Sequence, residues 1–185
     1  MNKQIKILIL ANFLIIVIGG LYLLLFNSPK IQTINYPVSN FEDCVASGNL
    51  VMESYPRQCR DGDTTYREDI GNELEKIDLI ILDSPRPNEK VSSPLEIRGQ
   101  ARGLWFFEAD FPVFLEDANA NVIAEGIATA QSDWMTNDFV PFAATLTFNT
   151  NVNSHGLKVK LILKKDNPSD LVELDDVLEL PVIIK

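Results

Sequence analysis

The C-terminal part of the chain alternates apolar and polar residues, and this period limits the folds that it can adopt. From residue 77 onward, stretches such as 95–102 and 157–161 place an apolar or small side chain at every second position. Successive side chains of a strand point to opposite faces, so the period predicts strands with one buried and one solvated face. We expect no amphipathic helix of useful length after residue 76, and therefore an all-β region.

Seven strands are predicted in this region, with turns rich in Pro, Asn, Asp and Ser between them. They are expected near residues 77–82, 94–102, 106–117, 121–130, 139–149, 156–165 and 177–184. The spacing leaves no room for crossover helices, so we expect an antiparallel, immunoglobulin-like β-sandwich. A small open barrel is the structural alternative. The Cys…Trp…Cys spacing of antibody domains is absent, so the likeness concerns architecture only.

The N-terminal residues 7–26 form an apolar run, ILILANFLIIVIGGLYLLLF, which contains no charge and only one strongly polar side chain, Asn12. Twenty helical residues span about 30 Å, the thickness of a bilayer core, so a transmembrane α-helix is predicted. The alternative is a cleaved signal peptide, but the run is longer than the apolar region of most signal peptides, and no small-x-small cleavage site follows. No cysteine lies near its end, which disfavours a lipoprotein anchor.

Charge predicts how this signal anchor is oriented in the cell membrane. Lys3 and Lys6 precede the helix and should keep residues 1–6 cytoplasmic, so the rest of the chain is expected to be extracytoplasmic. All 26 acidic but only 13 of the 16 basic residues lie in residues 31–185. Such an acidic domain repels phosphate backbones, so no nucleic acid partner is expected.

The segment after the predicted helix contains both cysteines of the chain, Cys44 and Cys59. Outside the cytoplasm a lone pair most often forms a disulfide, whereas metal and redox sites favour closer spacings. Asp61-Gly62 predicts a hairpin with a type I′ turn. We therefore divide the N-terminal part into a stalk (27–40), a disulfide-stapled hairpin segment (41–70) and a connector (71–76), followed by the sandwich (77–185).

Several motifs in the sandwich recur in the order found in a known family. They are the Ser-Pro-x-Pro turn at residue 84, the Ser-Pro-Leu strand at 93, the Gly-x-Ala-Arg-Gly bend at 99–103 and the Ala-Glu-Gly strand at 124–126. Residues 80–184 resemble the immunoglobulin-like domain of bacterial spore germination proteins. The resemblance implies an extracytoplasmic binding or scaffolding module without known catalytic residues. The two-cysteine segment resembles a short module found beside such domains in bacterial membrane proteins.

Candidate chemistry is sparse in the sequence. His155 is the only histidine and lies in a turn, where a solvated side chain is the simpler reading. Asp117–Asn121 imitates the start of a calcium loop, but Val122 and Ala128 replace its glycine and its glutamate, so a β-turn is predicted. A weak calcium site would require the loops that carry four C-terminal acids to converge: Asp166, Asp170, Asp175 and Asp176. We expect no catalytic residue, no resident metal and no cofactor.

The aromatic run 104–107 offers the strongest candidate for a binding surface. Alternation can bury only two of its four residues on one face, which leaves Trp105 and Phe106 as candidates for a binding patch together with Trp134. The alternative is a corner-filling tryptophan inside the sandwich.

These features predict a non-catalytic, membrane-anchored protein that presents its immunoglobulin-like domain to a protein or a cell-envelope glycan. A structural spacer or assembly subunit is the alternative, and it is favoured if both tryptophans are buried. A calcium-assisted hydrolase is the candidate from the enzyme class, and it requires carboxylates that converge in a cleft.

Overall fold

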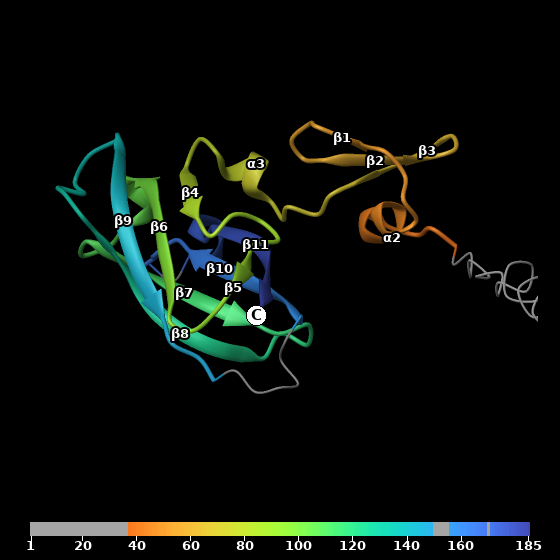
Figure 1. Ribbon diagram of the computed structural model, residues 1–185. Coiled ribbons are helices and arrows are strands. Elements are labelled where there is room, and N and C mark those ends of the chain that lie inside the picture. The colour runs from red at the N-terminus through yellow and green to blue at the C-terminus, as the bar shows by residue number, and fades with distance from the viewer. Residues whose placement is uncertain (1–36, 150–155, 170) are drawn as a thin grey trace, which may run out of the picture. The chain divides into compact units, whose positions relative to one another are not determined.

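The computed structural model describes residues 37–149, 156–169 and 171–185 (Figure 1). The predicted membrane helix at residues 7–26 lies outside this range, as does most of the predicted stalk. Within the described residues, no helix is both long enough and apolar enough to cross a membrane.

The sandwich is built from strands close to the predicted positions. Within the described residues one sheet contains eight strands in the order β4-β6-β9-β8-β7-β10-β11-β5 (Figure 1). Their bounds are β4 (Ile80–Ser84), β5 (Lys90–Val91), β6 (Leu95–Arg102), β7 (Asp110–Glu116), β8 (Val122–Ala130), β9 (Phe139–Leu146), β10 (Lys158–Lys164) and β11 (Val177–Ile184). The short β5 was not predicted, and it pairs parallel with β11. The expectation of a purely antiparallel arrangement is therefore wrong at this edge.

The sheet folds over between β8 and β9 to give the two layers of a sandwich. These strands share only the pairs Thr129–Ala143 and Ala130–Phe142, whereas β6 and β9 pair along their whole length. The alternating inward side chains of both layers, including Ile97 on β6 and Leu161 on β10, belong to one buried cluster. The period-two pattern thus supplies a common core, which confirms the prediction of a mainly β, immunoglobulin-like architecture.

Residues 38–70 are called the stapled module below. The module contains the helix α2 (Phe41–Ala46) and a separate small sheet of the strands β1 (Val51–Met52), β2 (Gln58–Asp61) and β3 (Thr64–Arg67). The predicted disulfide between Cys44 and Cys59 is present, with the two Cα atoms 6.0 Å apart. Both cysteines are fully buried beside Phe41.

Two local details of the stapled module differ from the sequence prediction. Helix α2 was not expected; it begins where the Asn40 side chain accepts a 2.8 Å hydrogen bond from the Asp43 amide, as N-cap residues do. The hairpin turn consists of Gly62 and Asp63, and of these two only Gly62 has a positive φ. That pattern fits a type II′ turn rather than the expected type I′.

The connector closes the outer edge of β11. Asn72 precedes the short helix α3 (Glu73–Lys76), and its side-chain amide donates to the Val177 carbonyl (2.9 Å) while accepting from the Glu179 amide (2.8 Å). The Asn72 amide N–H also donates to the Glu179 carbonyl at 3.1 Å. A single asparagine therefore replaces a missing strand neighbour, which reduces the tendency of an open edge to pair with another chain.

Candidate functional site

The structure places the predicted aromatic patch largely inside the sandwich. Trp105 is fully buried and Phe106 is 4% exposed, and both rings contact Phe111 edge-on, with centroids 6.5 and 5.2 Å apart. The short turn η1 (Gly103–Trp105) reverses the chain at the end of β6 and directs these rings inward. Trp134 is partly buried against the same core. The corner-filling alternative therefore describes Trp105, and the candidate patch at Trp105 and Phe106 is not exposed.

The calcium-like sequence at residues 117–121 forms the predicted turn. The Asp117 carboxylate accepts hydrogen bonds from the amide groups of Asn119 and Asn121, at 2.8 and 2.9 Å, and from the Asn121 side chain. These donors, first the Asn121 side chain, lower the pKa of Asp117. The carboxylate oxygens thus serve the turn itself, as is usual for Asx turns.

The C-terminal acids are divided among separate contacts. Asp176 pairs with Lys76 at 2.5 Å, and Asp175 accepts a 2.8 Å hydrogen bond from Asn167. Asp170 and His155 lie outside the described residues. In the part of the chain that the structure describes, no three His, Cys, Asp or Glu side chains gather in a way that could hold a metal ion.

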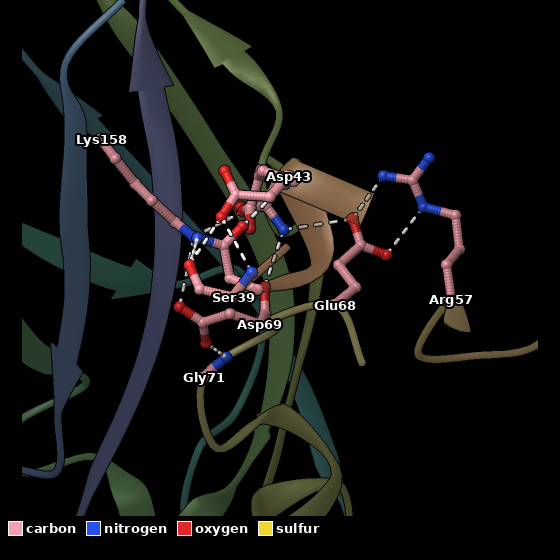
Figure 2. A network of polar contacts seen from close by, with 10 residues as sticks. Ser39, Asp43, Arg57, Glu68, Asp69, Gly71 and Lys158 are labelled. Carbon is pink, nitrogen blue, oxygen red and sulfur yellow. Dashed lines mark hydrogen bonds and ion pairs between the residues drawn. The ribbon is translucent and has the colours of Figure 1, made fainter. Parts of the chain in front are cut away.

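A network of polar contacts joins the stapled module to the sandwich, and we call it the junction (Figure 2). At its centre, Glu68 receives two hydrogen bonds from Arg57, at 2.5 and 2.8 Å, in the paired geometry that guanidinium and carboxylate groups favour. Asn88 of the sandwich donates to Glu68 (3.2 Å) and to the Asp69 carbonyl (2.7 Å). The Glu68 side chain is almost completely buried by these contacts.

Lys158, at the start of β10, forms the second contact of the junction. Its ammonium group lies 3.3 Å from a carboxylate oxygen of Glu42 on α2 and 3.3 Å from one of Asp69 (Figure 2). The other Asp69 oxygen accepts the Gly71 amide at 3.0 Å. One lysine of the sandwich therefore bridges two parts of the stapled module that are distant in sequence.

Glu73 forms a third contact and is 5% exposed. Arg86 lies 2.8 Å from one of its oxygens, and the Tyr55 hydroxyl donates to the other. The Arg86 guanidinium also lies over the Tyr55 ring, 5.6 Å from its centroid. Burial raises the pKa of Glu73, and the nearby Arg86 opposes that shift.

A hollow of about 390 Å³ adjoins the junction. Its charged lining consists of Asp69, Glu116, Asp117, Glu179, Lys158 and Lys160. The two lysines pair with Asp69 and Glu179, and Asp117 accepts hydrogen bonds within its own turn. The ion pair of Lys158 with Asp69 can hold two parts of the chain together. Catalysis would instead require a free base beside a nucleophile.

No residue of the junction was predicted from a local sequence pattern. Its central acids lie in the polar stretch 68–76, which carries no hydrophobic period, and their partners lie up to about a hundred residues away. A run of charges at that position is indistinguishable from a solvated linker. The one available signal of burial was Ile70, an isoleucine in this polar stretch, whose side chain is 6% exposed.

Replacing Glu68 tests the electrostatic part of the junction. The hydrogen bonds from Arg57 lower the pKa of Glu68 below its ordinary value of 4.5, so its contribution to stability exists above that pH and is lost as the pH falls through the lowered value. We expect Glu68→Gln to lower the free energy of unfolding by about 1 to 2 kcal/mol at pH 7, because Arg57 is half exposed and the pair is partly screened. The difference between the two proteins should shrink on acidification below pH 4.5, as measured by urea unfolding.

Glu73→Gln is the matched control for this prediction. The pKa of Glu73 is shifted upward by burial, so its ionisation is less favourable in the folded than in the unfolded protein. Glutamine retains the acceptor for Tyr55 or Arg86, and we expect a smaller change than for Glu68→Gln, with the opposite dependence on pH. Equal losses in the two variants at every pH would show that charge does not matter in the junction.

The comparison with known families concerns the sandwich. Residues 79–167 match the family model described as the immunoglobulin-like domain of bacterial spore germination. The match supports the resemblance over that range, while the N-terminal segment and the stapled module lie outside it. Searches of curated proteins and of solved structures returned no match.

Proposed function

We propose that this chain is a non-catalytic, membrane-anchored protein that presents its immunoglobulin-like domain to a protein or cell-envelope partner outside the cytoplasm. The observation that carries the proposal is the junction. It attaches the sandwich to the stapled module, and the module directly follows the predicted anchor and stalk in sequence. A domain held in this way is preorganised for a partner, because less freedom is lost on binding than with a flexible linker.

The charges of the junction support a positioning role. Glu68, Glu73 and Lys158 each contact an oppositely charged side chain, so each charged group is compensated rather than free to react. Glu68 and Glu73 are buried, so removing Arg57 or Arg86 would leave a buried carboxylate without its partner, which is costly. The ion pairs of Lys158 are largely exposed and contribute less. This is the behaviour expected of a scaffold.

A structural spacer or assembly subunit remains the second candidate. The burial of Trp105 favours it, because the tryptophan side chain that was expected to mark a binding patch belongs to the core. The two candidates share the anchor and the junction and differ in whether the sandwich has a partner-binding surface.

Membrane topology tests the proposal directly. In the full chain carrying alkaline phosphatase at its C-terminus, we expect phosphatase activity, since this enzyme requires the oxidising environment outside the cytoplasm. The fusion should remain in the membrane fraction after a high-salt wash. The double variant Ile15→Lys/Ile16→Lys should lose retention, because each central lysine costs about 2.5 to 3.5 kcal/mol of insertion free energy.

Two results would contradict the proposal. One is an inactive C-terminal phosphatase fusion together with a fluorescent C-terminal fusion to a reporter that fluoresces only in the cytoplasm. The other is a mature protein whose mass shows removal of residues 1–26, since cleavage would release the domain from the membrane.

A further inference from the structure

One end of the sandwich gathers most of its exposed apolar side chains. We call it the loop end and define it as residues 74–78, 103–109, 131–138 and 165–176, with Asp170 left aside. Its exposed large apolar side chains are Leu74, Ile77, Leu104, Phe107, Met135, Leu171, Val172 and Leu174. Elsewhere in the described sandwich, such exposure is limited to Val122, Ile127 and Leu157.

Strand register places these four segments at the same end. The end of β6 pairs with the start of β9, at Arg102 and Phe139, and the end of β10 pairs with the start of β11, at Lys164 and Val177. Strand β4 begins opposite Ala101, and β7 begins opposite the end of β8. Lys158 lies at the other end of β10, so its contacts with the stapled module lie away from the loop end. The contact of Tyr55 with Glu73 instead lies directly beside Leu74.

Contacts between the segments make the loop end one continuous surface. The Arg102 guanidinium donates to the carbonyl groups of Asp78 (3.0 Å) and Asn137 (3.1 Å). The Asp166 amide donates to the Trp105 carbonyl at 3.1 Å, and Lys76 pairs with Asp176. These bonds connect all four segments to one another.

The most exposed of these apolar residues are Val172 and Met135, at 79% and 77%. A hollow of about 330 Å³ lies beside Met135, between Leu104 and the partly buried Trp134. Apolar side chains gathered at one end of a soluble domain mark an interaction site more often than the same residues scattered singly. A central hollow flanked by flexible side chains such as methionine suits an apolar anchor from a partner.

The charge around this surface is acidic. Exposed carboxylates come from all four segments: Glu75, Asp78, Glu108, Asp133, Asp138, Glu173 and Asp175. The two lysines of the loop end are engaged within the chain, Lys76 with Asp176 and Lys165 with the Leu174 carbonyl. The loop end therefore combines exposed apolar side chains with an excess of exposed carboxylates, which we call the acidic rim.

We propose that the loop end docks a protein partner through a segment that combines basic and apolar side chains. The apolar residues of that segment would cover Met135 and Val172, and its basic residues would pair with the acidic rim. Anionic lipid headgroups would be repelled by the same rim, which favours a protein over a membrane surface. This inference rests on the proposed function, because it names the surface and the partner chemistry through which the domain would be used.

A defined peptide tests the docking surface. The full chain, in nanodiscs of phosphatidylcholine, is titrated with a fluorescent amphipathic peptide of lysine and leucine at helical spacing, and empty nanodiscs supply the background. We expect saturable binding that weakens with salt, and no binding of the matching glutamate and leucine peptide. The double variant Met135→Ser/Val172→Ser should bind about tenfold more weakly, since two large apolar contacts are lost.

The chain supplies a matched control and a test of the rim. Val122→Ser/Ile127→Ser removes two apolar side chains of β8 that are 52% and 53% exposed, and we expect it to leave peptide affinity unchanged. Asp138→Asn/Glu173→Gln should weaken binding and reduce its salt dependence, because two charges of the rim are lost. All of these positions are exposed, so the variants should fold, and circular dichroism verifies this.

Three results would overturn the inference. The first is that Val122→Ser/Ile127→Ser weakens peptide binding as much as Met135→Ser/Val172→Ser does. The second is that the acidic peptide binds as tightly as the basic one. The third is that anionic phosphatidylglycerol vesicles, and not the peptide, bind at the loop end. If these tests fail while the phosphatase fusion remains active outside the cytoplasm, the proposed docking surface is rejected and the proposed function stands.

Discussion

Replacing Gly71 with alanine is expected to destabilise the protein by about 3 to 5 kcal/mol, the largest effect that we predict for a single substitution. Gly71 has a φ of +65°, a conformation that residues with a Cβ adopt at a cost. In addition, a Cβ at this position would overlap the backbone carbonyl of Glu179 on β11. The connector would have to move away from the strand edge, and Asn72 would lose its hydrogen bonds to Val177 and Glu179.

Gly48→Ala is the matched control for this experiment. Gly48 also has a positive φ, +80°, but a Cβ there would meet no atom within 4 Å. It should therefore show the backbone cost alone, on the order of 1 kcal/mol. Equilibrium unfolding in urea measures both variants. Similar losses for Gly71→Ala and Gly48→Ala would show that the close approach of the connector to β11 does not contribute to stability.

Removing the disulfide with Cys44→Ser/Cys59→Ser is expected to unfold the stapled module while the sandwich stays folded. Closing a loop of this size stabilises a chain by about 3 kcal/mol, and the module has little else, because its core consists of Phe41 and the two cysteines with Val38 and Tyr66 around them. The sandwich has its own large buried cluster, which does not include these residues.

Hydrogen exchange distinguishes the two parts of the protein. The amides of β2 (Gln58–Asp61) and β3 (Thr64–Arg67) should lose their protection in the double serine variant, whereas those of β6 and β9 should exchange as in the parent protein. Unchanged protection in β2 and β3 would mean that the junction alone folds the module. Loss of protection throughout would mean that the module and the sandwich unfold together.

The strands illustrate how far local pattern extends. β6, β8, β10 and β11 lie within one or two residues of their predicted positions, because a half-buried strand must alternate apolar and polar side chains whatever lies opposite. β5 was missed because two residues cannot show a period. It exists only because β11 offers a parallel partner, at Ile183 and Ile184.

The candidate site was less predictable than the strands. Alternation alone leaves Trp105 and Phe106 either as a candidate binding patch or as core residues, and η1 interrupts the alternation and turns both rings into the core. Glu68 falls in the predicted disulfide-stapled segment and Glu73 in the polar connector, and neither has a local signal of burial. Their burial depends on Asn88 and Arg86, partners that no local pattern connects with them.

Most strand positions, the disulfide partners and the acidic character of the domain follow from local sequence, because each depends on the kinds of residues present and on their order. The set of charged residues buried in the junction and the set of apolar residues that meet at the loop end follow from the folded arrangement instead. Those outcomes depend on contacts between segments that are distant in sequence, and the free energy of a contact is set by both partners and their shared exclusion of water.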